Sequence, residues 1–197
     1  TYARPDRLGE KYYHMILLAY NNTGYENLVK MQTTAWWDGY YHKPRIDWEV
    51  LEQHHEGLIG TTACLGGIVN QHLLRGDMDS AKAELGRMVD IFGVENTFVE
   101  IQNHGLPEQE KILGQQVELA RWSGAELLAA CDSHYCCEGE HDLHDSLLCA
   151  STGATKDQER RFRFDSDQFF LHSADQMNEL FPDHMFPRAV SNTVAIA

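Results

Sequence analysis

Apolar runs of strand length alternate with helical patterns along most of the chain, and this alternation restricts the fold more than any other feature. Four runs are short and rich in aliphatic, β-branched or aromatic residues, as buried strands are: 12–20, 57–63, 96–102 and 126–131. Spaced apolar residues predict helices over 25–36, 48–55, 68–76, 77–93, 107–122, 142–151, 173–181 and 187–197. Strands that alternate with helices predict an α/β fold with a mainly parallel sheet under helical cover.

Four long strands are too few to close a barrel, so the pattern is typical of the later part of one. A further short strand is expected at 168–172, and residues 1–11 are expected to form a loop. A length of 197 residues suits a single domain over 1–197, and a hydrophobic fraction of 43% is enough for a buried core.

Charge and cysteine content exclude some classes of protein. Thirty acidic against sixteen basic residues give a net charge of −14, which argues against a passive nucleic-acid-binding module because such modules are usually basic. Five cysteines without framework spacing indicate a reducing compartment, and the expected location is cytoplasmic. No apolar run approaches the roughly 20 residues of a membrane span, so no membrane partner is expected.

Asp132 and His134 directly follow the apolar run 126–131 and are the first candidate metal ligands. Residues at i and i+2 point to the same side of an extended chain, so both side chains could enter one cavity. A carboxylate and an imidazole together favour a divalent ion such as zinc or manganese. An aspartate that caps a turn explains the same pair without a metal, and the spacing alone does not decide between the two interpretations.

Two more candidate ligands lie at other predicted strands. Cys64 ends the strand 57–63, and the following Gly66 and Gly67 would allow a close approach of the backbone to a ligand. His14 lies inside the predicted strand 12–20. As alternatives, Cys64 is a small buried apolar residue and His14 a hydrogen-bonded core residue.

Several polar residues could support such a site from nearby. Glu100 ends its strand, His104 lies in the loop after it, and His144 could hydrogen-bond a ligand from a predicted helix. Cys131, Cys136 and Cys137 lack the second cysteine pair that a structural zinc site requires, so they are interpreted as packing residues.

One basic cluster, "RRFRF" at 160–164, interleaves arginines with aromatic residues. Its arginines could contact a phosphate backbone or dock another domain; they are Arg160, Arg161 and Arg163. The chain contains no P-loop, dinucleotide-binding motif or nucleophile elbow, so covalent nucleophilic catalysis has little support.

Taken in order, seven segments resemble the PHP (polymerase and histidinol phosphatase) domain, in the version found in the bacterial DNA polymerase III alpha subunit. These segments are "YHMILLAYNNTGYENLVKM", "YYHKPRID", "EGLIGTTACLGG", "IQNHGLPEQ", "CDSHY", "HDLHDSLLC" and "RFRFDSDQFFLHS". The resemblance implies part of a seven-stranded (β/α) barrel with a divalent-metal site at its mouth, holding zinc, manganese or magnesium. It also implies that the polymerase palm follows residue 197.

Carried over residue by residue, the resemblance implies four metal ligands, His14, Cys64, Asp132 and His134, with Asp132 and His134 also catalytic. One departure is large. The family's opening H-x-H strand, and the Asp, His and Glu ligands after it, would lie before Thr1, so the chain resembles the later two-thirds of the domain. The metal cluster would then be incomplete, and the isolated fragment is expected to be inactive.

Three functions follow as hypotheses. The first is the PHP region of a replicative DNA polymerase with metal-dependent 3′–5′ exonuclease activity, and primer-template DNA and other holoenzyme subunits as partners. The second is a structural PHP scaffold that braces the polymerase and binds partner subunits. The third is a free-standing PHP phosphoesterase.

Overall fold

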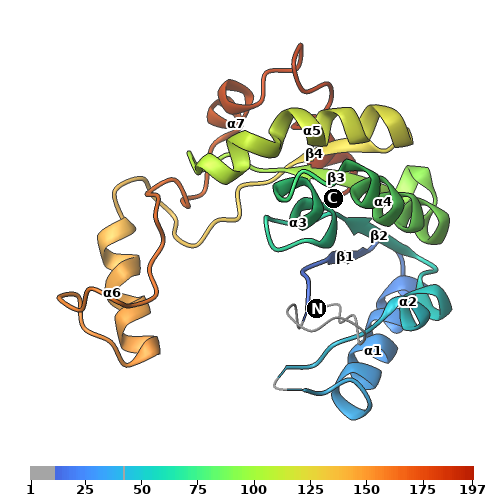
Figure 1. Cartoon of the computed structure of the whole chain (residues 1–197), viewed down its shortest axis with the longest axis horizontal. Helices are drawn as coiled ribbons and strands as arrows, with labels where there is room; N and C mark the ends of the chain where they lie inside the picture. The colour runs from blue at the N-terminus through green and yellow to red at the C-terminus, as the bar shows by residue number, and fades with distance from the viewer. Residues whose placement is uncertain (1–11, 42) are drawn as a thin grey trace.

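A computed structural model describes residues 12–41 and 43–197, and within them four strands form one sheet (Figure 1). The strands lie in the order of the chain: β1 (Ile16–Ala19), β2 (Leu58–Thr61), β3 (Thr97–Ile101) and β4 (Glu126–Ala129). The pairs β2–β3 and β3–β4 are parallel, whereas β1 pairs with β2 in the antiparallel direction. The sheet is therefore mainly parallel, and the predicted α/β class is confirmed.

Helices connect the strands and follow the last one. They are α1 (Asn22–Trp37), α2 (Trp48–His54), α3 (Ile68–Leu74), α4 (Met78–Phe92), α5 (Pro107–Ser123), α6 (His141–Thr152), α7 (Ala174–Leu180) and α8 (Ser191–Ala195), with a 3-10 turn η1 (Val94–Asn96). None of the helices in the described part of the chain is long and apolar enough to cross a membrane.

Local sequence signals fix where several helices start and stop. Asp47 and Asp77 accept hydrogen bonds from the first-turn amides of α2 and α4, which would otherwise lack partners. Ser173 and Gln176 form a reciprocal capping box at the start of α7. Helix α5 begins at Pro107 and is terminated by Gly124, the residue after Ser123, whose φ of 77° is one that glycine adopts without strain.

Two apolar layers sandwich the sheet because alternate strand residues face opposite sides. On one side, Leu58, Val99 and Leu127 join the main core under α3, α4 and α5 (Figure 1). On the other side, Ile59, Phe98 and Leu128 form a smaller cluster with Ile196 from the end of α8. Thr61 and Glu100 occupy the next positions on this second side, one pleat nearer the carboxyl ends of β2 and β3.

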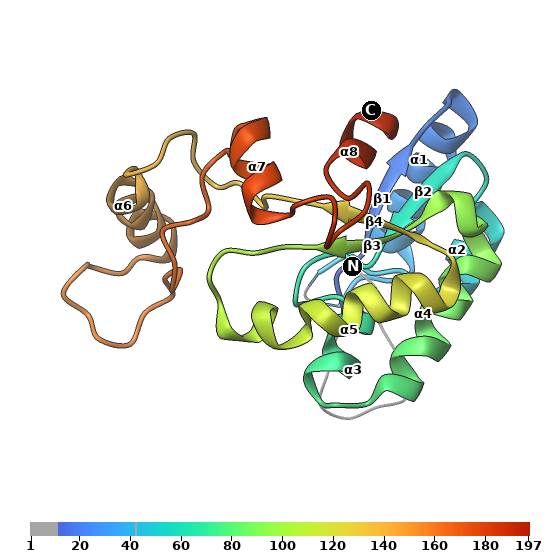
Figure 2. The same ribbon diagram turned by 90° about the horizontal axis from the view of Figure 1, so that it is seen from above.

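Residues 131–172, here called the arm, project from the rest of the described chain, here called the body (Figure 2). The arm contains α6 and two legs, 131–140 and 153–172, which have no helix and no strand beyond a single bridge. The legs run alongside each other at Tyr135 and Phe170, where Leu171 N–H donates to the carbonyl of Tyr135 at 3.0 Å. After the arm the chain returns to the body, and Ala129 N–H donates to the carbonyl of Ala189 at 2.9 Å.

Some sequence expectations are corrected. Strand β1 starts at Ile16, so His14 precedes the strand instead of lying within it, and only a single bridge joins it to Gly67. The predicted strand 168–172 is reduced to the single bridge at Phe170, because only the other leg of the arm is available for pairing. The loop expected at 1–11 lies outside the described residues.

Candidate metal centre

A cavity of about 390 Å³ opens at the carboxyl ends of β2, β3 and β4, next to the amino end of β1. In parallel sheets this edge is where functional side chains gather. The residues that line it are His14, Met15, Ile16, Ala63, Cys64, Glu100, Gln102, Ala130 and Asp132. Three of the four predicted ligands therefore share one cavity, together with Glu100.

The antiparallel direction of β1 explains how His14 reaches this edge. Because β1 runs opposite to β2, a residue just before β1 lies beside residues just after β2. His14 Nδ1 lies 3.4 Å from Cys64 Sγ, and His14 N–H donates to the carbonyl of Gly66 at 2.9 Å. A Cβ at Gly66 would lie 3.0 Å from His14 Nδ1, so glycine leaves room for the imidazole.

Asp132 lies where the arm leaves the body, and its backbone adopts an uncommon conformation. Its φ is 42°, in the left-handed region that few residues other than glycine adopt. Ala63, in the wall of the same cavity, also has a positive φ, of 56°. Such backbone strain gathers at functional sites, because the surrounding structure must hold it in place.

His134 stands beside Asp132, with 3.6 Å between its Nε2 and Asp132 Oδ1. Its ring is not in the cavity wall. It packs instead against Phe164 and Phe169, with ring centroids 4.6 and 5.8 Å away. Asp132 thus links the cavity to an aromatic cluster in the arm.

Glu100 forms the floor of the cavity and is 2% exposed. Thr61 Oγ1–H donates to its Oε2 at 2.6 Å, and Gln102 Nε2–H donates to its Oε1 at 2.8 Å. Burial raises the pKa of the Glu100 carboxyl, although these two hydrogen bonds oppose the rise and nearby Asp132 adds to it. No lysine or arginine is among the described residues that line the cavity.

The pKa of the Cys64 thiol is shifted in the same direction as that of Glu100. Burial raises its pKa, a hydrogen bond from the backbone of Gly66 opposes the rise, and the charges of Asp132 and Glu100 add to it. The cavity therefore combines two carboxyl groups with a thiol whose pKa is raised above its ordinary value, and the carboxylate charge attracts cations.

His104 is 1% exposed and lies beneath the start of the arm. Gln109 Nε2–H donates to its Nδ1 at 2.8 Å, so the ring proton lies on Nε2, which donates to the carbonyl of Cys131 at 2.6 Å. Burial lowers the pKa of His104, which keeps the imidazole neutral. Its ring also stacks on Phe169, with 4.1 Å between the ring centroids. His104 therefore contacts both the outgoing leg of the arm, at Cys131, and the returning leg, at Phe169.

His144 belongs to α6 and is 8% exposed. Its ring packs against His134, Tyr135 and Phe164, with centroids 5.5, 5.4 and 5.0 Å away. Burial lowers its pKa, and its Nδ1 has no hydrogen-bond partner among the described residues. His144 therefore backs His134 through packing, and the structure gives it no hydrogen bond to Asp132.

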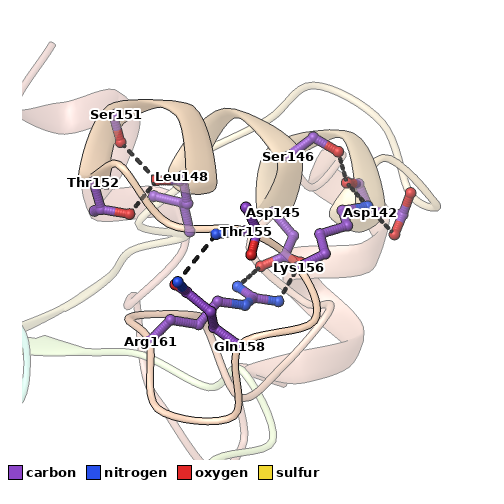
Figure 3. A network of polar contacts seen from close by, with 10 residues as sticks. All are labelled: Asp142, Asp145, Ser146, Leu148, Ser151, Thr152, Thr155, Lys156, Gln158 and Arg161. Atoms are coloured by element: carbon purple, nitrogen blue, oxygen red, sulfur yellow. Dashed lines mark hydrogen bonds and ion pairs between the residues drawn. The ribbon is translucent and has the colours of Figure 1, made fainter.

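The three arginines of the basic cluster have different surroundings. Arg161 forms a bidentate ion pair with Asp145 of α6, at 2.5 and 2.7 Å, and this pair is 7% and 13% exposed (Figure 3). Arg161 is thus engaged within the arm. Arg160 is exposed, and Arg163 lines a second pocket next to the cavity.

The donor atoms fit a divalent cation in type and in pairwise spacing. A tetrahedral zinc ion separates a nitrogen and a sulfur ligand by about 3.5 Å, close to the His14–Cys64 distance, and the Asp132–His134 distance is similar. However, among residues 12–41 and 43–197 no three His, Cys, Asp or Glu side chains converge closely enough to hold a metal. The described residues therefore supply two ligand pairs, each incomplete.

Sequence reasoning missed the polar floor and the aromatic wall of the site. Thr61, Gln102 and Gln109 bind Glu100 and His104, yet nothing in their local spacing marks them, because their partners come from other segments of the chain. Phe164 and Phe169 flank His134. The aromatic-rich segment 162–170 is the sequence signal for this wall.

Comparison with known proteins gives consistent matches. The chain is 40% identical to the DNA polymerase III subunit alpha of Treponema pallidum over 190 residues, 96% of this chain and 16% of that protein. It is 39% identical to the protein of that name from Borreliella burgdorferi over 194 residues, 98% of this chain and 17% of that protein. It is 40% identical to the one from Thermus aquaticus over 187 residues, 94% of this chain and 15% of that protein. The chain thus spans about a sixth of the length of these relatives.

The family comparison covers the part of the chain that supplies the body side of the site. The pattern of the PHP domain matches residues 2–104, more than half of the chain and including His14, Cys64 and Glu100. Asp132 and His134 lie beyond that match but within the alignment that covers 98% of the chain. This chain belongs to the PHP domain family.

Proposed function

We propose that this chain is the PHP region of a replicative DNA polymerase III alpha subunit, and that its cavity hydrolyses the 3′-terminal phosphodiester of DNA with divalent metal ions. The observation that carries the proposal is the convergence of His14, Cys64 and Asp132 on one negatively charged cavity. The relatives of about 40% identity, all named DNA polymerase III subunit alpha, support the assignment to a polymerase. Primer-template DNA and other holoenzyme subunits are the partners proposed with it.

His14, Cys64, Asp132 and His134 would hold the metal, which is zinc, manganese or magnesium. When bound, such ions lower the pKa of water, orient a phosphodiester and stabilise a leaving oxyanion. The histidine and thiol ligands favour zinc, whereas manganese and magnesium prefer oxygen ligands such as the Asp132 carboxylate.

The chain's own groups have separate tasks in this proposal. Asp132 and His134 lie 3.6 Å apart beside the cavity and would act in catalysis as ligands of an ion next to the reacting phosphate. Thr61 and Gln102 fix the Glu100 carboxyl, which contributes negative charge beneath the cations. His104 fixes the backbone carbonyl that directly precedes Asp132 and is a positioning residue.

The test is digestion of mismatched primer ends by the complete polymerase polypeptide, in manganese and without deoxynucleotides. Asp132→Asn should lower the rate at least about a hundredfold, because it removes a charged group proposed to touch the reacting centre. Asp90→Asn, at an exposed position of α4, is the matched control and should keep the full rate. An unchanged rate in Asp132→Asn would sink the hydrolytic proposal.

A structural scaffold is the second candidate, and one observation favours it. No complete three-ligand group occurs among the described residues, as expected for a domain that braces the polymerase without catalysis. For a scaffold, Cys64→Ala would lower the melting temperature while no nuclease activity exists to lose.

A further inference from the structure

A second pocket of about 250 Å³ adjoins the cavity and shares Cys64, Gln102 and Asp132 with it. Its other lining residues come from the arm, from the loops after β2 and β3 and from the first turn of α5: Leu65, Leu106, Gln109, Phe162, Arg163, Phe164, Asp165 and Phe169. Three phenylalanines and two leucines make one part of the wall apolar, and Arg163 and Asp165 supply charge. This volume lies a little below the roughly 300–1,000 Å³ of most small-molecule sites, which suits one small ring system.

The three phenylalanines form a connected wall. Phe162 and Phe164 meet edge to face at 5.7 Å, and Phe164 meets Phe169 in the same way at 4.6 Å. Phe162 is 61% exposed, a large apolar area for a ring at the mouth of a pocket. Aromatic faces of this kind stack on nucleobases, and they do so without choosing among sequences because every base has a π face.

The charged residues favour a nucleotide over a purely apolar ligand. Arg163 is exposed and makes no ion pair with another described residue, unlike Arg161, which is held by Asp145. Guanidinium groups bind phosphate oxygens in a bidentate manner. Asp165 repels phosphate but accepts hydrogen bonds from the amino groups and ring N–H groups of bases.

We propose that this aromatic pocket binds the base of the 3′-terminal nucleotide of single-stranded DNA, with Arg163 on a backbone phosphate. The inference rests on the proposed function, because it takes a DNA 3′ end as the substrate. The shared wall at Cys64 and Asp132 then places the phosphodiester of that nucleotide at the candidate metal centre. Phe162 and Arg163 bind the substrate in this account and take no part in bond cleavage.

Photochemical cross-linking tests the pocket without requiring hydrolysis. A single-stranded oligonucleotide that ends in 5-iodouracil is bound to the complete polypeptide in EDTA and irradiated, and the attached peptide is mapped by mass spectrometry. Cross-links should map to residues 162–169. Phe162→Ala should lower their yield about tenfold, since stacking on one aromatic ring strengthens binding by this order. Because Phe162 is mostly exposed, this variant should fold normally.

Arg160→Ala is the matched control, because it removes the same charge from an exposed position outside the pocket. It should keep the wild-type yield in this segment, whereas Arg163→Ala should lower it. Cross-links that map only outside 162–169, or an unchanged yield in Phe162→Ala, would overturn the proposal. A polypeptide that forms these cross-links but digests no DNA would refute the hydrolytic function and support the base-binding pocket.

Discussion

The body and the arm are built by different interactions. In the body, buried aliphatic and aromatic residues from β2, β3, β4 and six helices form one cluster, and its buried members within the described chain all lie outside the arm. The arm instead relies on rings packed around His144 and on ion pairs between α6 and the loop after it (Figure 3). A large apolar core resists local opening, whereas a segment with few apolar contacts opens at lower free energy.

The candidate site lies where these two parts meet. His14 and Cys64 belong to the body, and Asp132 and His134 belong to the first residues of the arm. The stable part thus supplies two candidate ligands, and the less stable part supplies the two that are proposed to be catalytic. Motion of the arm relative to the body would separate the two pairs, so the contacts at the junction matter to the site.

The largest effect is expected at His104, which holds both legs of the arm. His104→Ala removes the stack on Phe169 and leaves the buried Gln109 amide and the Cys131 carbonyl without their partner. The free energy of unfolding should fall by about 3 kcal/mol, measured by urea denaturation. His184→Ala, at an exposed position, should change it by less than about 0.5 kcal/mol. Equal values for the two variants would show that the arm does not depend on this junction.

The second largest effect is expected from metal removal, because an ion bound by ligands from both the arm and the body would hold the two parts together. At a metal concentration one hundred times the dissociation constant, binding stabilises the folded state by about 2.7 kcal/mol. EDTA should therefore lower the melting temperature of the complete polypeptide. Cys64→Ala should melt at the same temperature with or without EDTA, whereas Cys136→Ala, at an exposed cysteine, should respond like wild type. A normal response in Cys64→Ala would remove Cys64 from the ligand set.

The third effect is a difference between two ion pairs within the arm, one nearly buried and one exposed. Arg161 and Asp145 are nearly buried, so Arg161→Met leaves a largely covered carboxylate without its partner. The Lys156–Asp142 pair is exposed, and its loss should have little effect. Hydrogen exchange in α6 should quicken at least about tenfold in Arg161→Met and stay nearly unchanged in Lys156→Met, with the body amides unchanged in both. Faster exchange throughout the body would mean that the two parts unfold together.

The smallest expected effect is a pH dependence of the free energy of unfolding that originates at His104, where the arm meets the body. Burial lowers the pKa of His104 below its ordinary value of 6.5, so the unfolded chain takes up this proton at a higher pH than the folded protein does. The stability linked to His104 is therefore complete above about pH 6.5 and is lost as the pH falls below it. His144 acts in the same direction, because burial lowers its pKa too.

Denaturation curves between pH 7 and 5 measure this dependence. His104→Gln should be less sensitive to acid than wild type, whereas His184→Gln should retain the full sensitivity. If His104→Gln lost stability on acidification as steeply as wild type, the titration of other groups would account for the slope. Asp145 does not interfere in this range, because Arg161 lowers its pKa and its contribution is lost only at more acidic pH.

Much of the fold could be predicted from local patterns. The strands at 57–63, 96–102 and 126–131 and the first seven helices occur close to their predicted positions, because apolar periodicity, Asp47, Asp77, Pro107 and Gly124 act over a few residues. The helix predicted over 187–197 is reduced to α8. The direction of β1 could not be predicted in this way. Strand direction depends on which edge of the sheet the chain reaches, and both directions place the same residues in contact with the core.

Residue identity and short-range spacing are enough to predict the α/β class, the family and the types of donor atom available. Which of those residues meet depends on how the chain packs in three dimensions. Antiparallel β1 brings His14 to Cys64, a left-handed Asp132 starts the arm, and Arg161 is held by Asp145 while Arg163 lines a pocket. The His14–Cys64 contact, for example, joins segments far apart in the chain, and such contacts form only when the core is packed.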